Sequence, residues 1–146
     1  MEKNIISGKI PPELGDLQWL GALLLLEWNQ LSGEVPSELG KLNNLLNLSL
    51  RNNHLSGQIL QQLEIQALDL SSNNIPATIG NYASLLSLNL SNNDLSGEVP
   101  YYIGNLFLLQ YLLDPSSNSF SGRVPQDLSK LKTRQNLNLS RNNFSG

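Results

Sequence analysis

The sequence predicts a solenoid of the α/β class, in which the chain winds into successive coils with a parallel β-sheet on one face and short turns on the other. Two observations lead to this prediction. Three residue types, with 33 Leu, 19 Asn and 18 Ser, fill nearly half of the 146 residues, and such a bias is typical of repetition. A pattern of about 24 residues also recurs along the chain, which is the signature of stacked structural units. We therefore expect one domain over residues 1–146 with about six coils.

The repeat is clearest between Tyr82 and Asn105, where the chain reads YASLLSLNLSNNDLSGEVPYYIGN. Counting Tyr82 as position 1, apolar residues stand at positions 1, 4, 7, 9, 14, 18 and 22. Apolar positions 7 and 9 flank a polar position 8, which is the alternation of a short strand with one buried face. Since each coil contributes one such strand in the same direction, the strands are expected to form a parallel sheet.

An asparagine recurs at position 12, where each coil turns out of its strand. A buried amide there can satisfy backbone groups of its own coil and of the adjacent coils. We interpret these residues as a structural ladder formed by Asn29, Asn53, Asn73, Asn93, Asn118 and Asn142.

The segment after this asparagine reads Leu-Ser-Gly-x-(Ile/Val)-Pro in most coils. Its glycine permits backbone angles that a Cβ forbids, and its proline starts the return path. The Glu-Leu-Gly segments that follow are expected to form single 3₁₀ turns that end at glycine. Three departures stand out: the motif is altered at residues 58–66 and shortened at residues 73–76, and Pro115 takes an inward strand position.

The unit L-x-x-L-x-x-L-x-L-x-x-N-x-L-S-G-x-I-P-x-x-L-G-x closely resembles the plant-specific leucine-rich repeat over essentially the whole chain. Within that family it is most similar to ectodomains of plant receptor-like kinases and receptor-like proteins. The resemblance implies a right-handed superhelix, a concave β face that binds partners, and an extracellular or cell-surface location. The family's ends are usually closed by caps that contain cysteine, and the chain has no Cys. We therefore expect an excised piece of a longer array with uncapped ends.

Outward positions 6, 8, 10 and 11 of each strand should form this concave face. Exposed aromatic residues are enriched at binding hot spots, so Trp28 is the best single anchor candidate. The alternative is that one extra residue in the first coil turns Trp28 inward, and both readings stay open. Position 10 includes Ser71, Ser91 and Ser116, which are also expected to point outward. The candidate partner-binding residues are Leu25, Glu27, Trp28, Arg51, Asp69, Asn89, Asp114 and Arg141.

Four Asn-x-Ser sequons are candidates for N-glycosylation, and they begin at Asn47, Asn89, Asn138 and Asn143. The motif is weak by itself, and the abundance of Asn and Ser inflates its count. The first three belong to the predicted concave face, where a glycan would block a partner. Either those sites carry no glycan, or that patch is not the interface.

Composition argues against several other functions. The formal net charge is −3 and the nine basic residues do not cluster, so no nucleic acid partner is expected. With no Cys and one histidine, His54, we expect no metal, no cofactor and no thiol chemistry. Asp69 and Asp114 should lie about 10 Å apart, too far to act as a coupled pair. We expect no enzymatic activity, no signal peptide and no transmembrane segment in this chain, and no membrane contact by it.

Three functions remain in order of preference. The first is a recognition module for a protein or peptide ligand, such as a co-receptor or a microbial protein, in defence or development signalling. The second is a secreted defence protein that resembles polygalacturonase inhibitors or antimicrobial proteins. The third is an ice-binding protein, although coils spaced 24, 20, 20, 25 and 24 residues apart disturb a regular face. Exposed apolar ends also predict self-association.

Overall fold

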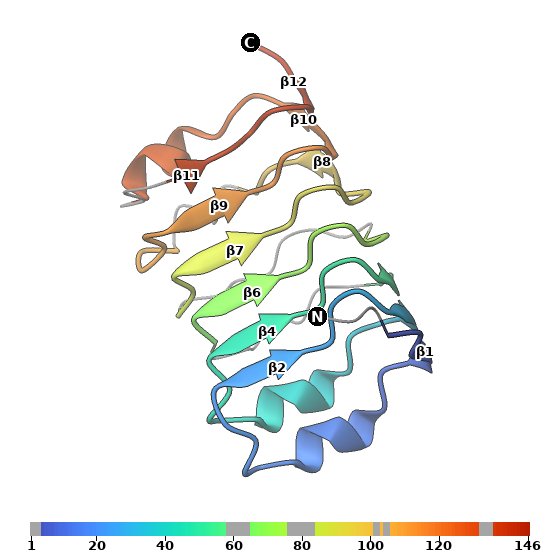
Figure 1. Cartoon of the computed structure of the whole chain (residues 1–146). Coiled ribbons are helices and arrows are strands. Elements are labelled where there is room, and N and C mark those ends of the chain that lie inside the picture. Colours follow the sequence, from blue (N-terminus) through green and yellow to red (C-terminus); the bar gives the residue numbers. More distant parts are fainter. Residues whose placement is uncertain (1–3, 58–64, 76–83, 101–102, 104–105, 132–135) are drawn as a thin grey trace.

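The computed structural model shows a stack of coils with one long parallel sheet and short 3₁₀ helices on the opposite side (Figure 1). It describes residues 4–57, 65–75, 84–100, 103, 106–131 and 136–146. Of the two altered stretches of the repeat, residues 58–64 and residue 76 lie outside the described residues, whereas 65–66 and 73–75 are described. The predicted solenoid fold is confirmed by this architecture.

The long sheet has six parallel strands with neighbouring order β11-β9-β7-β6-β4-β2. Its register aligns the position 7 residue of each coil with that of the next, as in the pairing of Leu48 with Leu68 and of Leu68 with Leu88. The shared register keeps one leucine of every strand on the buried face. The strands are β2 (Leu23–Leu25), β4 (Asn47–Ser49), β6 (Ala67–Asp69), β7 (Ser87–Asn89), β9 (Leu112–Asp114) and β11 (Asn136–Leu137).

The core is a column of leucines stacked along the array. Leu50, Leu70 and Leu90 at position 9 are each no more than 2% exposed. Contact between successive coils removes these side chains from water, which is the main stabilising term in such a stack. At the two ends the same columns are less covered, and Leu137 is 45% exposed.

The position 12 asparagines link neighbouring coils through buried hydrogen bonds. The amide of Asn73 donates to the backbone oxygens of Leu50, Leu70 and Ser71 at 3.0–3.3 Å. Its Oδ1 accepts the backbone N–H of Leu55 at 2.9 Å. Because Asn73 is buried, loss of this side chain would leave several backbone groups without partners in a dry interior.

A second ladder, which the sequence did not predict, runs beside the long sheet and is divided in two. One part joins β1 (Ser7–Lys9), β3 (Gln30–Gly33) and β5 (His54–Leu55). The other joins β8 (Ser96–Glu98), β10 (Ser119–Gly122) and β12 (Asn143–Phe144).

Both parts are built from the Leu-Ser-Gly segments, whose glycines have positive φ, as at Gly33 and Gly122. Between the two parts, the coil of Asn73 passes from Ile75 directly to Pro76 and lacks the Ser-Gly step. Among the described residues the second ladder is divided between β5 and β8, and this deletion falls in the coil between them.

The return path carries the 3₁₀ helices η1 (Pro12–Asp16), η2 (Ser37–Lys41) and η4 (Gln126–Lys130). The predicted 3₁₀ type is confirmed, but the end point is wrong for η1 and η2, which run one residue past their glycines. Gly15 explains the difference: a Cβ there would lie 2.2 Å from the backbone oxygen of Glu38. The glycine allows η1 and η2 to pack closely and does not serve as a helix terminator.

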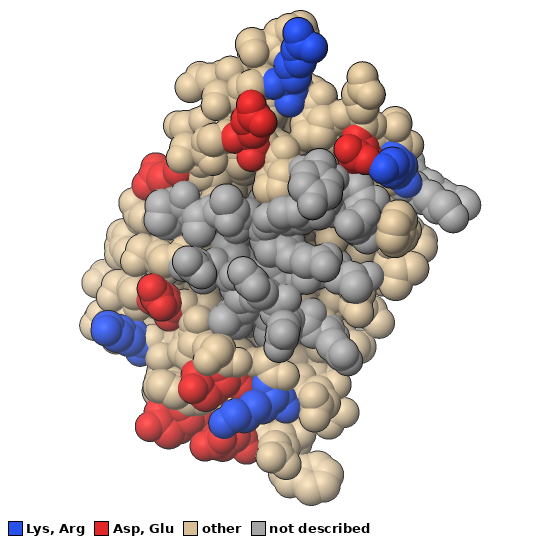
Figure 2. Space-filling model, turned by 180° about the vertical axis from the view of Figure 1, so that it is seen from behind, with Lys and Arg blue, Asp and Glu red and all other residues tan. Residues whose placement is uncertain are grey.

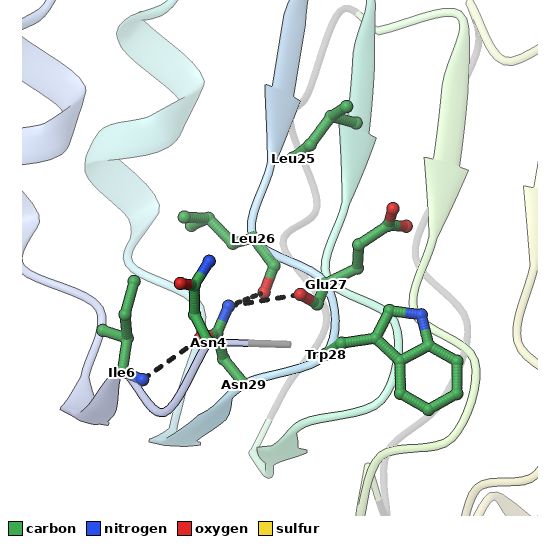
Figure 3. A pocket seen from close by; sticks show the side chains of 7 residues that line it. All are labelled: Asn4, Ile6, Leu25, Leu26, Glu27, Trp28 and Asn29. Atoms are coloured by element: carbon green, nitrogen blue, oxygen red, sulfur yellow. Dashed lines mark hydrogen bonds between the residues drawn. The ribbon is translucent and has the colours of Figure 1, made fainter. Parts of the chain in front are cut away.

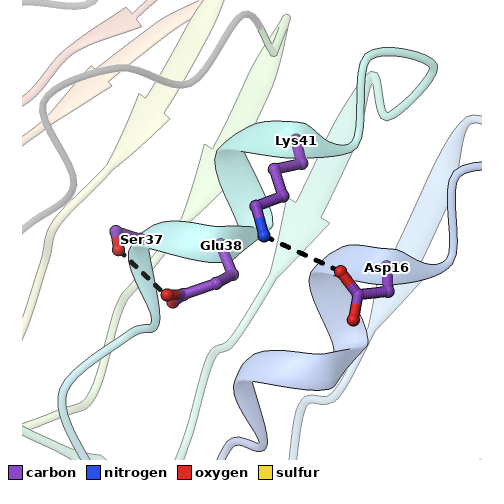
Figure 4. A network of polar contacts seen from close by, with 4 residues as sticks. All are labelled: Asp16, Ser37, Glu38 and Lys41. Atoms are coloured by element: carbon purple, nitrogen blue, oxygen red, sulfur yellow. Dashed lines mark hydrogen bonds and ion pairs between the residues drawn. The ribbon is translucent and has the colours of Figure 1, made fainter.

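Charged side chains gather on the face away from the long sheet near η1 and η2 (Figure 2). Lys41 Nζ lies 3.7 Å from Asp16 Oδ1 and links the two coils, and Ser37 donates to Glu38 within η2 (Figure 4). The side chains of Lys41 and Asp16 are 58% and 70% exposed, so solvent screens their attraction and little stability is expected from it.

Pro115 occupies buried position 9 of the fifth coil. In the preceding coils this position donates its N–H to the next strand, as Leu90 does to the oxygen of Asp114 at 2.8 Å. Proline has no N–H, so the ladder loses one bond there. Consistent with this, β11 has two residues where the other five strands have three.

Candidate binding face

Trp28 stands on the concave side of the first coil and is 43% exposed. The reading in which it turns inward is therefore wrong. The register explains why: Leu23, Leu24 and Leu25 pair directly with the second strand, so the extra residue of this coil is absorbed before the strand begins.

The backbone of Trp28 adopts φ of 59°, a left-handed conformation that is uncommon for a bulky residue. The position is shared along the array, and the residues with the same conformation are Asn52, Ser72, Asn92, Ser117 and Arg141. At this position the other coils have Asn, Ser or Arg, and a large aromatic residue adds backbone strain to the left-handed conformation. Such outliers point to function more than to folding.

Trp28 belongs to a small cluster with both charge signs. The guanidinium of Arg51 lies 5.7 Å from the centre of a Trp28 ring, within range of a cation–π contact. Glu27 is half-buried and accepts a hydrogen bond from the Ser49 hydroxyl at 2.9 Å. The neighbouring Leu25 is 45% exposed. An apolar surface, a cation and an anion are thus held together within two coils.

A groove of about 350 Å³ lies beside β2, and we call it the N-terminal groove. In Figure 3 the side chains of Leu25, Glu27 and Trp28 project to one side of the chain, away from Ile6 and Asn29. Asn29 accepts from the Ile6 N–H at 3.1 Å and donates to the oxygens of Leu26 and Glu27. The N-terminal groove is lined by Asn4, Ile6, Leu25, Leu26, Glu27, Trp28 and Asn29.

Position 8 of the concave face alternates between carboxylate and amide in the later coils. The Oδ1 of Asp69 accepts both the N–H and the hydroxyl of Ser71, and Asn89 does the same for Ser91. These local turns draw the serines under the side chains of position 8.

The expectation that the position 10 serines point outward is therefore wrong. Ser71, Ser91 and Ser116 are 2%, 7% and 6% exposed, because each lies against an oxygen two residues earlier in its own coil. In the middle coils the side chains of position 8 are therefore accessible on the concave face, whereas the serines of position 10 are buried and hydrogen-bonded to them.

A shallow hollow of about 180 Å³ lies across the middle of the concave face, and we call it the central hollow. It crosses β4, β6, β7 and β9, so its long direction runs across the strands. Small side chains make the depression, and Asp69 is the charged residue among the described residues that line it. The lining is Asn47, Leu48, Ser49, Ala67, Leu68, Asp69, Ser87, Asn89 and Leu112.

The arrangement offers little for catalysis or metal binding. Asp69 and Asp114 are separated by Asn89 in the register, which puts them about 10 Å apart. Asp114 instead lies near Asn138, whose Nδ2 is 3.4 Å from its Oδ2. His54 is exposed in β5. Within the described ranges, no group of three or more His, Cys, Asp or Glu could hold a metal ion.

The four sequons have different surroundings. Asn47 and Asn89 are half-buried on the long sheet, and Asn138 is half-buried on the same face. The Oδ1 atoms of Asn89 and Asn138 are occupied by Ser91 and Ser140 respectively. Asn143 differs because it lies exposed in β12, away from the long sheet.

The remaining candidate, Arg141, is exposed at position 11 of the sixth coil, far along the array from Trp28. The central hollow was not found by sequence reasoning. Its signal was the run of small residues at outward positions, Ser49, Ala67 and Ser87, between Leu25 and Leu112. In the sequence alone, small outward residues indicate only a solvent-exposed strand face. The hollow is recognised once the larger side chains around them are placed.

Comparisons with known proteins agree with this geometry. Residues 84–106 match the family model described as Leucine Rich Repeat. Receptor-like protein 39 of Arabidopsis thaliana is 39% identical over 145 residues, which cover 95% of this chain and 14% of that protein. The chain therefore spans about one seventh of the length of this curated relative.

Two solved structures are similar over nearly the whole chain. The Arabidopsis receptor kinase HAESA, in complex with the peptide hormone IDA and the co-receptor SERK1, matches 100% of this chain and 25% of its own with TM-score 0.86 and 40% identity. The plant peptide hormone receptor RGFR1, in complex with RGF2, matches 99% and 24% with TM-score 0.91 and 34% identity. In the part of the chain that the structure describes, no helix is long and apolar enough to cross a membrane.

Proposed function

Because this chain belongs to the leucine-rich-repeat family and is similar to plant receptor-like ectodomains, we propose that it is a non-catalytic module that binds a peptide or protein ligand through its concave face. Its relatives are receptors, so its place is at the cell surface or outside the cell, in defence or development signalling. A co-receptor or a microbial protein is a further possible partner.

The observation that carries this proposal is the presentation of Trp28. A half-exposed tryptophan in a left-handed backbone conformation, with Arg51 over its ring and Leu25 lining the same groove, has the features of an interface hot spot. Tryptophan and arginine are the residues most enriched at such centres. The fixed sheet beneath holds them in place before binding, which lowers the entropy cost of association.

The two alternative functions are less favoured by the same face. An ice-binding surface needs one side chain repeated at equal steps, whereas position 8 holds Leu25, Ser49, Asp69, Asn89, Asp114 and Asn138. A polygalacturonase inhibitor remains a protein-binding module, and it would use the same concave face. Failure to inhibit fungal pectinases at micromolar concentration would exclude that version.

The test uses a random 12-residue peptide library displayed on phage and selected against the immobilised chain. Peptides that bind are then titrated against wild type, Trp28→Asn and Trp19→Asn. Asparagine suits the left-handed conformation, as Asn52 and Asn92 show at the same position, so the first variant removes the ring and keeps the backbone. Trp19 is 96% exposed and lies outside the long sheet, which makes it the matched control.

We expect Trp28→Asn to weaken binding about tenfold or more, in keeping with a hot-spot residue. Trp19→Asn should change affinity less than about twofold. Equal losses for the two variants, or no selected peptide at all, would overturn the proposal.

Self-association through the ends is a separate proposal about this chain. Ile5 and Ile6 are 80% and 51% exposed at one end, and Leu137 and Val124 are each 45% exposed at the other. Apolar surface of this kind favours contact between copies. Sedimentation velocity should show a mass that rises with concentration, and a constant monomer mass at high concentration would contradict it.

A further inference from the structure

The central hollow has a chemistry that is more specific than a general peptide-binding surface. Its lining includes Ser49, Ala67 and Ser87, whose short side chains leave room above the sheet. Leu112 closes it on one side. A depression of about 180 Å³ is large enough for one long side chain but not for a folded element.

The carboxylate of Asp69 is fixed in the wall of this hollow. Its Oδ1 accepts the Ser71 hydroxyl at 2.6 Å and the Ser71 N–H at 2.9 Å. The group is half-buried, and it forms no ion pair with any described residue. A carboxylate that is oriented in advance, half-buried and without a counter-ion is a favourable partner for a cation that enters the hollow.

The neighbouring position 8 residues show that the charge is not needed for the local fold. Asn89 forms the same two bonds to Ser91, and Asn138 forms them to Ser140. An amide oxygen therefore serves this turn as well as a carboxylate oxygen does. The negative charge of Asp69 is free for a role other than capping.

We propose that the central hollow takes the Lys or Arg side chain of an extended peptide and pairs it with the Asp69 carboxylate. This inference rests on the proposed function and names the chemistry of its ligand. The peptide runs across the strands, since the hollow is lined by residues of four adjacent strands, β4 to β9.

The spacing of the two contacts follows from the sheet. Trp28 belongs to the first coil and Asp69 to the third, so two strand spacings of about 4.8 Å each separate their rows along the array. An extended peptide rises about 3.3 Å per residue. Trp28 stands at position 11 and Asp69 at position 8, so an offset along the strands adds to this distance. The cationic residue is therefore expected about three to four positions from the apolar or aromatic residue that packs on Trp28.

The experiment uses the peptides selected from the phage library against the whole chain. We expect them to share a Lys or Arg, about three to four positions from an aromatic or apolar residue. Replacing that cation by norleucine should weaken binding to wild type about fivefold or more, the size of a partly exposed ion pair with good geometry. The same replacement should change binding to Asp69→Asn less than about twofold.

Asp94→Asn is the matched control, because Asp94 is an exposed carboxylate that lies outside the long sheet and does not line the central hollow. It should bind the selected peptides as wild type does. Thermal unfolding of Asp69→Asn should match wild type, since asparagine keeps the bonds to Ser71. Raising the salt concentration should reduce the difference between wild type and Asp69→Asn.

The outcomes separate the two proposals. Peptides that depend on Trp28 but bind Asp69→Asn as tightly as wild type would overturn the role of the central hollow and leave the proposed function standing. Selected peptides without a shared cationic residue would do the same. Binding that is insensitive to Trp28→Asn, or no binding at all, would instead overturn the proposed function, and this inference with it.

Discussion

The two ladders of this solenoid use the same coils, yet one is continuous and the other is broken. The long sheet runs through all six strands in one register, whereas the second ladder is divided between β5 and β8. Every coil keeps the leucine of position 7 and the asparagine of position 12, and all but one keep the leucine of position 9, where the fifth coil has Pro115. The Ser-Gly step is missing from one coil, which lies between the two parts of the second ladder.

The comparison teaches that coils of different length can keep the common register of the long sheet. Coils spaced by 20 and by 24 residues deliver strands to the same sheet, because the long sheet is held by side chains that lie within and just after each strand. The strand register of the concave face is therefore the same in coils of different length. The return path absorbs the variation in length.

The largest loss of unfolding free energy is expected for Asn73→Ala, which removes buried hydrogen bonds between two coils in the middle of the array. The change leaves the buried backbone groups of Leu50, Leu55 and Leu70 without this partner, at a cost of about 3 kcal/mol or more in unfolding free energy. Urea denaturation followed by circular dichroism measures it.

The end residue Asn29 provides the control for that prediction. It lies half-buried, its amide donates to two carbonyl oxygens of its own coil, and it meets the preceding coil through the exposed N–H of Ile6. Asn73 instead bonds buried groups of the preceding coil through both its amide and its Oδ1. Asn29→Ala should cost only about 1 kcal/mol. Equal costs for the two variants would show that the linkage between coils adds nothing.

On the return path, Gly15→Ala is expected to be the most costly small change. Its Cβ would meet the backbone of Glu38 at 2.2 Å and force η1 away from η2, with a loss of about 1–3 kcal/mol. Gly21→Ala, where no atom lies within 4 Å of the new Cβ, is the control and should shift the melting temperature little. Similar melting temperatures for both variants would contradict the close packing.

The broken bond of the long sheet can be restored with Pro115→Leu. Leucine at this position supplies an N–H that can donate to the sixth coil, as Leu90 donates to the fifth, with a gain of about 1 kcal/mol. Hydrogen exchange should show a protected amide at residue 115. The amide of Ser117, already bonded to Ser140, should not change. An unprotected amide at residue 115 would argue that proline is not what shortens β11.

The smallest effect is expected for Lys41→Gln, which removes the ion pair with Asp16 between the first two helices of the return path. Because both groups are largely exposed, the loss should stay below about 0.5 kcal/mol. Asp16→Asn should behave alike, and the double variant should equal either single one. A loss above 1 kcal/mol would give the surface pair a role that its exposure does not support.

Part of the candidate site could be predicted from the sequence because it follows from the repeat. Counting from Asn29 places Trp28 at an outward position of the first coil, whereas the register of the strand was needed to show that the extra residue of this coil does not turn it inward. The burial of Ser71 could not be predicted in this way, since it depends on the direction in which Asp69 turns its carboxylate. Likewise, the central hollow needs side chains of four strands that are distant in sequence.

The sequence by itself determined the number of strands in the long sheet, their common register and the stacking of their leucines, because these follow from a periodic pattern in which each coil meets only its neighbours. The tertiary structure decided which polar residues are accessible, how the second ladder pairs and where it stops, and what space remains between side chains. Those properties depend on distances between coils of unequal composition, which no periodic pattern in one dimension specifies.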